Sequence, residues 1–174
     1  MKVRYIRLIV SIAVLMVLLF ASFSSIGPLP PLSKILTPSS GSDGFIGIAS
    51  NSTEALYYEQ GYLEAEYRLA QLDFLKRTAL GNLSAIAGPS TLQTDIFMRE
   101  IQLYNTAVLE RQNLSANNLT YIYLKSFVAG INAYIGNLTY ARLPLLFKIL
   151  NARPHAWNVT DVLAVQQLLL WENS

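Results

Sequence analysis

Residues 58–73 read YEQGYLEAEYRLAQLD and form the middle of a helix that the sequence predicts over about 53–80. Hydrophobic residues recur at steps of three and four, as on one face of an α-helix; they are Tyr58, Tyr62, Ala65, Leu69, Leu72 and Ala79. Asn51, with Glu54 three residues later, fits a capping box at the start of this helix. Gly81 stands where a left-handed C-cap belongs. We therefore expect one long helix with a single stripe that faces the core.

The remaining segments predict a mainly α fold with a short N-terminal strand. The strand is expected over 44–49, where small and branched residues alternate. Turn signals separate further helical segments; these cover about 91–112, about 116–135 closing at Gly136, a short piece between Pro144 and Pro154, and a last helix from Thr160 and Asp161 onward. The last helix is still running at Ser174, so the sequence reads as an incomplete domain. On the long helix, Asp73 and Arg77 are expected to pair at the surface, which stabilises by only a few tenths of a kcal/mol.

The N-terminus has the pattern of an export segment. Three cations precede the uncharged run Leu8–Phe23; they are Lys2, Arg4 and Arg7. This run of sixteen residues falls short of the roughly 20 that span a bilayer, so residues 1–27 are predicted to be either a signal peptide or a membrane anchor. Both interpretations place the rest of the chain outside the cytoplasm. Residues 28–42 are predicted to be a spacer rich in Pro and Ser, which leaves 43–174 as the helical domain.

Asn-x-Ser/Thr triplets are more frequent than chance predicts. Six of the eleven asparagines begin such a triplet, where the content of Ser and Thr would give roughly 1.5. The predicted N-glycosylation sites are Asn51, Asn82, Asn113, Asn118, Asn137 and Asn158. Helix capping offers another explanation for about half of the excess, because Asn51, Asn113 and Asn158 each precede an apolar periodic stretch.

The composition excludes several classes of site. The chain has no Cys and a single His, which excludes thiolate nucleophiles, disulfides, Cys-based metal sites and multi-His metal centres. Its formal charge of +2 becomes about −1 once the three cations of the leader are set aside, so nucleic acid is not an expected partner.

No complete catalytic group emerges from the residues themselves. Glu64 and Glu66 point different ways on a helix, and Glu59 lies about 10 Å along the axis from Glu66, so these carboxylates are expected to form a solvated face. His155 lies in a turn before the last helix, where a structural or surface role is the more common one. We therefore predict no catalytic residue and no metal ligand in this chain.

The long helix nevertheless resembles the start of the penicillin acylase (penicillin amidase) family. Residues 58–73 are similar to the family's G-Y-x-x-A-x-D-R-L-aromatic-Q-M-E/D segment. The resemblance continues through Arg77, Gly81, Leu83, Gly88, Asp95 and Arg99, through AGINAYI at 129–135, and to Trp157 and Asp161. It covers roughly residues 43–174, which resemble the family's small chain. The sequence departs from the family pattern at Gly47, Tyr67, Ala70 and Ala85. The resemblance therefore implies a divergent and truncated member of the family, or a decaying copy of one.

The resemblance implies an N-terminal-nucleophile hydrolase with a four-layer αββα fold, made by a precursor that cuts itself. The nucleophilic Ser would be the first residue of a large catalytic chain, with its own α-amine as base. The present chain would contribute to the acyl pocket through its last helix. Leu170 takes the position of an apolar substrate contact, and Asn173 and Ser174 stand where some members have an Arg and a Phe. Calcium is possible in the full-length family, but its ligand on the small chain would lie just past Ser174.

The residues and the resemblance together leave two functions open. The first is an extracytoplasmic amide hydrolase precursor that removes the acyl group from penicillin-like or other N-acyl amides, of which this chain is the small-chain part. The alternative is a non-catalytic, membrane-tethered, glycosylated helical protein derived from that family. In the first case the partners are the large chain and a small acyl amide, and in both the N-terminal segment meets the membrane.

Overall fold

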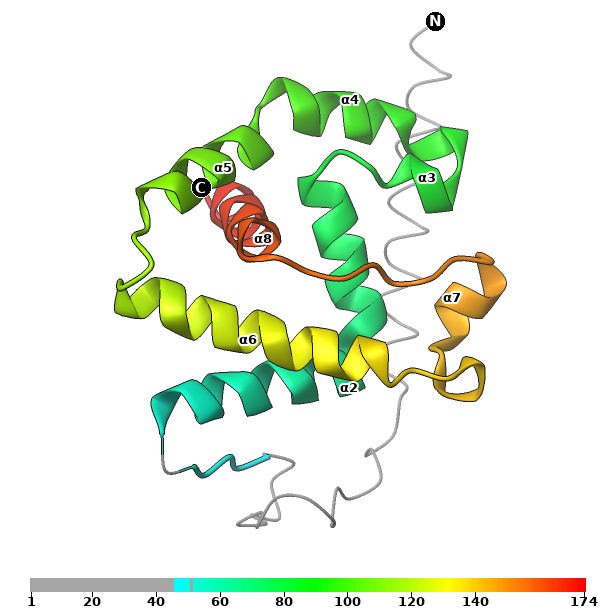
Figure 1. Cartoon of the computed structure of the whole chain (residues 1–174). Helices are drawn as coiled ribbons and strands as arrows, with labels where there is room; N and C mark the ends of the chain where they lie inside the picture. The colour runs from blue at the N-terminus through cyan, green and yellow to red at the C-terminus, as the bar shows by residue number, and fades with distance from the viewer. Residues whose placement is uncertain (1–45, 51) are drawn as a thin grey trace, which may run out of the picture. The chain divides into compact units, whose positions relative to one another are not determined.

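Helix α2 (Thr53–Ala79) is the longest element of the computed structural model, which describes residues 46–50 and 52–174 (Figure 1). The Ser52 side chain caps it by accepting a hydrogen bond from the Ala55 N–H at 3.1 Å. The cap is thus one residue after the predicted Asn51, which lies outside the described residues. Gly81 adopts the left-handed conformation expected of it, with φ of 60°. This geometry lets the N–H of Asn82 reach back to the Arg77 carbonyl at 2.8 Å.

A sharp bend divides α2 at Arg68, whose backbone leaves the helical range at φ −133° and ψ 22°. The first half of α2 runs beside α6 and the second half turns away from it (Figure 1). Bends of this kind usually occur at Pro or at Gly/Ser pairs, and the sequence has neither at this point. The helix predicted over about 53–80 is confirmed in its extent, and the bend at Arg68 is a feature that the prediction did not include.

Further helices follow α2 along the chain. They are α3 (Ser84–Ala87), the 3-10 turn η1 (Pro89–Thr91), α4 (Leu92–Glu100), α5 (Leu103–Asn113), α6 (Leu119–Gly136), the 3-10 turn η2 (Tyr140–Arg142), α7 (Leu145–Ile149) and α8 (Val159–Glu172). The predicted segments at 116–135, between the two prolines and after Thr160 correspond to α6, α7 and α8.

The helix predicted over 91–112 is two helices, α4 and α5, separated at Gln102. This residue has φ of 59° and ψ of 31°, a left-handed conformation that is rare outside Gly, Asn and Asp. No Gly or Pro marks the break, so the periodicity alone could not reveal it. The break lets α5 pack against α8 (Figure 1), and Gln167 of α8 donates a hydrogen bond to Glu110 of α5 at 3.0 Å.

The strand predicted over 44–49 is not found in its described part, residues 46–49, which have no regular secondary structure. A strand is held by the hydrogen bonds of a neighbouring strand, and residues 52–174 contain no strand that could pair with it.

Helix α8 differs slightly from the prediction as well. It ends at Glu172 with Asn173 as its C-cap, instead of continuing through Ser174.

The core forms where α6 crosses α2. Gly61 and Gly130 lie at the crossing, and each allows the other helix's backbone to approach. A Cβ on Gly130 would lie 1.9 Å from the Tyr58 carbonyl oxygen, and one on Gly61 would lie 2.0 Å from the Phe127 carbonyl oxygen. Around this contact, the interior includes fully buried side chains from three helices, among them Leu69, Ile131, Leu163 and Leu168. Two tyrosine pairs extend the contact, Tyr57 with Tyr123 and Tyr62 with Tyr134.

Half of the predicted stripe on α2 is buried as expected, with Ala65, Leu69 and Ala79 in the core. Tyr58, in contrast, is exposed.

Among residues 46–50 and 52–174, no helix is long and apolar enough to cross a membrane. The leader predicted over 1–27 and the spacer over 28–42 lie outside the residues that the structure describes.

We expect the substitution Gly130→Ala to lower the free energy of unfolding by about 1–3 kcal/mol or more, because a methyl group would overlap backbone atoms that cannot move aside. Thermal unfolding of the full chain, followed by circular dichroism, measures this change. Gly136→Ala in the same helix is the control, since nothing lies within 4 Å of its Cβ position. Equal melting temperatures for the two variants would contradict the close helix crossing.

Candidate functional site

An open groove of about 510 Å³ is bordered by α2, α6 and α8. Its walls are mostly apolar and are formed by Leu72, Leu75, Phe127, Val162, Val165, Leu169 and Leu170. Polar side chains complete the lining; they are Glu64, Arg68, Gln71, Gln166 and Asn173. An apolar cleft with a few polar groups suits a small apolar ligand or a segment of a neighbouring chain.

Trp157 lines this groove and is buried, with only 5% of its surface exposed. Asn132 of α6 fixes its backbone: Nδ2 donates to the Trp157 carbonyl at 2.8 Å, and Oδ1 accepts from the Trp157 N–H at 2.7 Å. The indole Nε1–H has no hydrogen-bond partner among the described residues. Leaving a buried donor unpaired costs about 1–3 kcal/mol.

A buried ion pair holds α8 against α2. The Lys76 ammonium lies 3.0 Å from Asp161 Oδ2, donates to the Ala156 carbonyl at 2.7 Å and lies 5.1 Å from the centre of the Trp157 ring. Asp161 also forms a capping box with Asn158, so the same carboxylate that binds Lys76 starts the helix. Lys76 and Asn132 together fix the segment that leads into α8, and with it the groove wall.

A second buried pair lies one turn away. Arg77 Nε donates to Asp73 Oδ2 at 2.6 Å, and Arg77 Nη2 donates to the Arg153 carbonyl at 3.4 Å. The prediction of a surface contact is wrong, because Asp73 and Arg77 are only 1% and 5% exposed. The helical spacing identified the two partners but gave no sign that the chain before α8 covers them.

Asp95 holds the turn after α2. Its carboxylate accepts from the backbone N–H groups of Leu83 and Ser84 at 2.7 and 2.8 Å. Burial alone would raise the pKa of Asp95, but these hydrogen bonds, that of the Ser84 side chain and the nearby Arg99 outweigh it and lower the pKa. Arg99 in turn donates to the Gly81 carbonyl at 2.9 Å. These residues, which carry part of the family resemblance, therefore serve the fold.

Two of the three predicted pocket residues line the groove. Leu170 is 59% exposed, and Asn173 donates through Nδ2 to the Leu169 carbonyl at 2.6 Å. Ser174 is not among the groove residues, and its hydroxyl donates to the Trp171 carbonyl at 2.8 Å. Sequence reasoning missed the bend at Arg68 and the unpaired indole of Trp157, because neither follows from local periodicity.

The groups weighed as catalytic candidates do not come together. Glu64 accepts a hydrogen bond from Gln60 at 3.0 Å, and His155 is exposed. In residues 46–50 and 52–174, no group of three His, Asp or Glu side chains is arranged to hold a metal ion.

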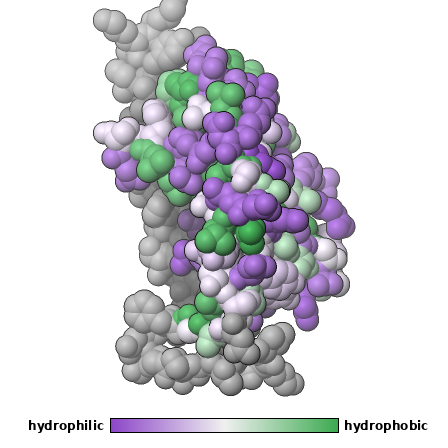
Figure 2. Space-filling view, turned by 60° about the vertical axis from the view of Figure 1, so that its left-hand side comes forward, coloured by the Kyte–Doolittle hydropathy of each residue, from purple (hydrophilic) through white to green (hydrophobic). Residues whose placement is uncertain are grey.

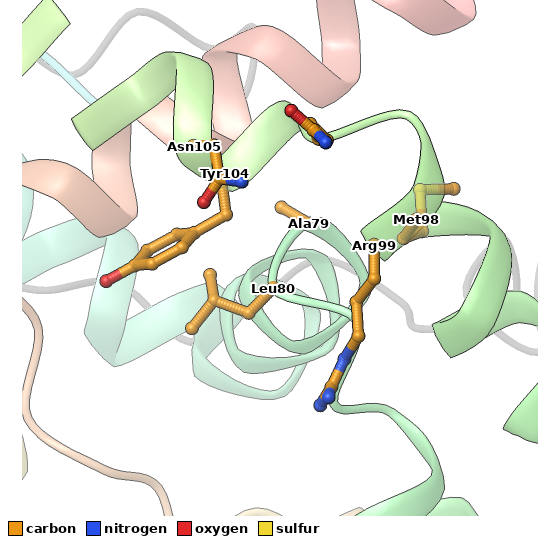
Figure 3. Close-up of a pocket in the computed structure, with 7 residues that line it drawn as sticks. Ala79, Leu80, Met98, Arg99, Tyr104 and Asn105 are labelled. Carbon is orange, nitrogen blue, oxygen red and sulfur yellow. The ribbon is translucent and has the colours of Figure 1, made fainter. Parts of the chain in front are cut away.

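A smaller cavity of about 230 Å³ lies where the end of α2 meets α4 and α5 (Figure 3). It is lined by Ala79, Leu80, Met98, Arg99, Gln102, Tyr104 and Asn105. In Figure 3 the side chains of Arg99 and Tyr104 extend in different directions on either side of Leu80. Since these polar groups do not converge on one point, we assign no ligand to this cavity.

The Lys76 pair gives a test of how α8 is held. We expect Lys76→Met to lower the free energy of unfolding by about 3 kcal/mol, because Asp161 would keep a buried charge without its partner. Chemical denaturation of the full chain measures the loss. Lys125→Met, on the exposed face of α6, is the matched control and should change stability by less than about 0.5 kcal/mol. Similar losses in both variants would show that the ion pair does not hold the helix.

Comparison with known proteins finds relatives of this chain. The chain is 29% identical over 121 residues to the penicillin acylase 2 proenzyme of Pseudomonas sp. (strain SE83), covering 70% of this chain and 15% of that protein. It is 31% identical over 109 residues to the acyl-homoserine lactone acylase QuiP of Pseudomonas aeruginosa, covering 63% of this chain and 12% of that protein. The chain thus spans well under a fifth of the length of either relative.

A solved structure shows the same fold. The thermostable penicillin G acylase from Alcaligenes faecalis superposes with a TM-score of 0.67 at 22% identity, over 77% of this chain and 72% of that chain. The model of the penicillin amidase family matches residues 42–174, which is most of the chain. With this match, the chain belongs to the penicillin amidase family.

Proposed function

We propose that this chain is the small-chain part of an exported acylase that hydrolyses N-acyl amides. The observation that carries the proposal is the groove between α2, α6 and α8, which has apolar walls and includes Trp157 and Leu170 in its lining. Family membership supports an acylase-type hydrolase. In this proposal the nucleophilic Ser and the groups that stabilise the oxyanion belong to a large chain from the same precursor.

The exposed apolar surface supports a large partner chain. Three consecutive residues near the end of α8, Leu169 to Trp171, are each more than 40% exposed, and Phe97 of α4 contacts Trp171 with ring centres 5.5 Å apart. Apolar residues also interrupt the hydrophilic surface elsewhere on the molecule (Figure 2). Exposed apolar patches of this kind mark surfaces that another protein covers. We propose that the large chain covers the end of α8 and part of the groove.

In the proposed reaction, the N-terminal Ser of the large chain attacks the amide carbonyl of the substrate and forms an acyl-enzyme, which water then hydrolyses. The present chain supplies a wall for the acyl group. Leu170 would contact the acyl chain, with Asn173 beside it in the lining of the groove. Ser174, which the resemblance also suggests, is not among the residues that line the groove. Because the walls are apolar, we propose an apolar acyl group. The two Pseudomonas relatives are named for a penicillin and for an acyl-homoserine lactone, and an acyl amide is the chemistry that these names share.

We further propose that the protein works outside the cytoplasm. The cations at Lys2, Arg4 and Arg7 followed by the apolar run Leu8–Phe23 support export, with residues 1–27 as a signal peptide or an anchor. These residues lie outside those that the structure describes, so the proposal rests on their sequence.

Purification of the native gene product tests the proposed function. We expect a second, larger chain to copurify, to begin with Ser, and to give a preparation that hydrolyses a chromogenic N-acyl anilide. Mutation of that Ser should abolish hydrolysis while the precursor remains uncut. A single chain without a partner and without amidase activity would favour the alternative, a non-catalytic helical protein of the same family.

The role of Leu170 is tested separately with Leu170→Trp in the active two-chain protein. A larger side chain in the pocket should reduce kcat/KM for long acyl chains by roughly 10-fold or more relative to short ones, since small steric changes in an apolar pocket are worth about 1–3 kcal/mol. Leu109→Trp is the control, because Leu109 is 61% exposed on α5 and does not line the groove. An unchanged acyl preference would exclude Leu170 from the pocket.

A further inference from the structure

The excess of Asn-x-Ser/Thr triplets has two explanations, glycosylation and helix capping, and the structure separates them. Asn118 and Asn158 are N-caps, of α6 and α8 respectively. Asn113 is not a cap of this kind, because it is the last residue of α5. Asn82 and Asn137 also lie at C-terminal helix ends. N-capping thus accounts for two of the five described sites, and it requires only the Asn, not a hydroxyl residue two positions later.

The five described asparagines that begin a triplet are all exposed and lie at or beside helix ends. They are Asn82, Asn113, Asn118, Asn137 and Asn158. None of them lines the groove or the smaller cavity. Asn132, which packs against the Trp157 backbone and has Tyr at the second position after it, does not begin a triplet.

We propose that these five asparagines carry N-linked oligosaccharides and that the groove carries none. The inference rests on the export proposed above, since the modification takes place outside the cytoplasm. It fits the proposed large chain, because glycans at these positions would leave the groove walls accessible. Asn51 begins a sixth triplet and lies outside the described residues.

The hydrogen bonds of these side chains are compatible with the modification. Asn118 and Asn158 accept their capping bonds through Oδ1, from the N–H of Thr120 at 2.8 Å and of Asp161 at 3.1 Å. The glycan attaches at Nδ2, so capping and attachment use different atoms. Asn137 Nδ2 donates to the Ala133 carbonyl at 3.0 Å, and one of its two protons remains after attachment.

The donor would be an oligosaccharide joined through its anomeric carbon to a lipid phosphate. A bond forms between Asn Nδ2 and the anomeric carbon, while the bond from that carbon to the phosphate oxygen breaks. The lipid phosphate leaves with the electron pair, and one amide proton passes to a base. No oxidation or reduction occurs in this transfer.

The test is the mass of the full chain purified from the cell that naturally exports it, combined with mass spectrometry of its peptides. We expect an intact mass above that of the polypeptide and sugar on the peptides that contain the five asparagines. Thr139→Ala should remove one glycan from Asn137, whereas Thr139→Ser should retain it. These variants leave the Asn137 hydrogen bond intact, so the loss of a glycan is not confused with misfolding. Asn117→Gln, beside Asn118 but outside any triplet, should leave the mass of the glycans unchanged.

Cell fractionation distinguishes the two ways in which the proposal fails. An exported chain whose mass equals that of the polypeptide would overturn glycosylation and leave the acylase proposal standing. An unmodified chain found in the cytoplasm would overturn glycosylation together with export. A glycan on Asn173, the asparagine that lines the groove, would overturn the inference that this surface is kept clear.

Discussion

Where Gly61 of α2 meets Gly130 of α6, the two backbones touch, because no side chain lies between them. This close approach determines how near the two helices can lie and therefore which side chains fill the space around them. Leu69 and Ile131 become fully buried on either side of it, and the Tyr57–Tyr123 and Tyr62–Tyr134 pairs form along the same contact. Helix α8 packs against both helices of this pair, and α5 packs against α8.

The position of α8 depends on polar contacts that are unusual for so small a core. Lys76 of α2 binds Asp161, and Asn132 of α6 binds the backbone of Trp157. One residue of α2 and one of α6 thus fix the start of α8 and the segment that leads into it. A buried charge that loses its partner is costly, which makes this arrangement more specific in geometry than apolar packing alone. The groove is the space left between three helices that are held in this way.

Local patterns in the sequence predicted most of the helices, because caps and apolar periodicity are properties of short segments. Gly81 and the start of α8 near Asp161 lie where these signals put them. The bend at Arg68 and the break at Gln102 were not predictable, since neither residue has an intrinsic preference for the conformation it adopts. Tertiary packing decides such positions. The same limit applies to the Asp73–Arg77 pair, whose spacing is visible in the sequence but whose burial is not.

For the candidate site, Leu170 and Asn173 were predicted from the family resemblance. That Trp157 lines the groove could be seen only in the folded structure.

The sequence has only two tryptophans, and they lie in opposite surroundings. Trp157 is buried beside the groove with its indole N–H unpaired, whereas Trp171 is 42% exposed near the end of α8. An indole emits at shorter wavelength in an apolar environment than in water, so the two contribute separable components to the intrinsic fluorescence. A protein that covers the end of α8 would therefore shift the emission of Trp171, whereas Trp157 is already buried in the single chain. The emission of Trp171 would thus report assembly with a partner without any added label.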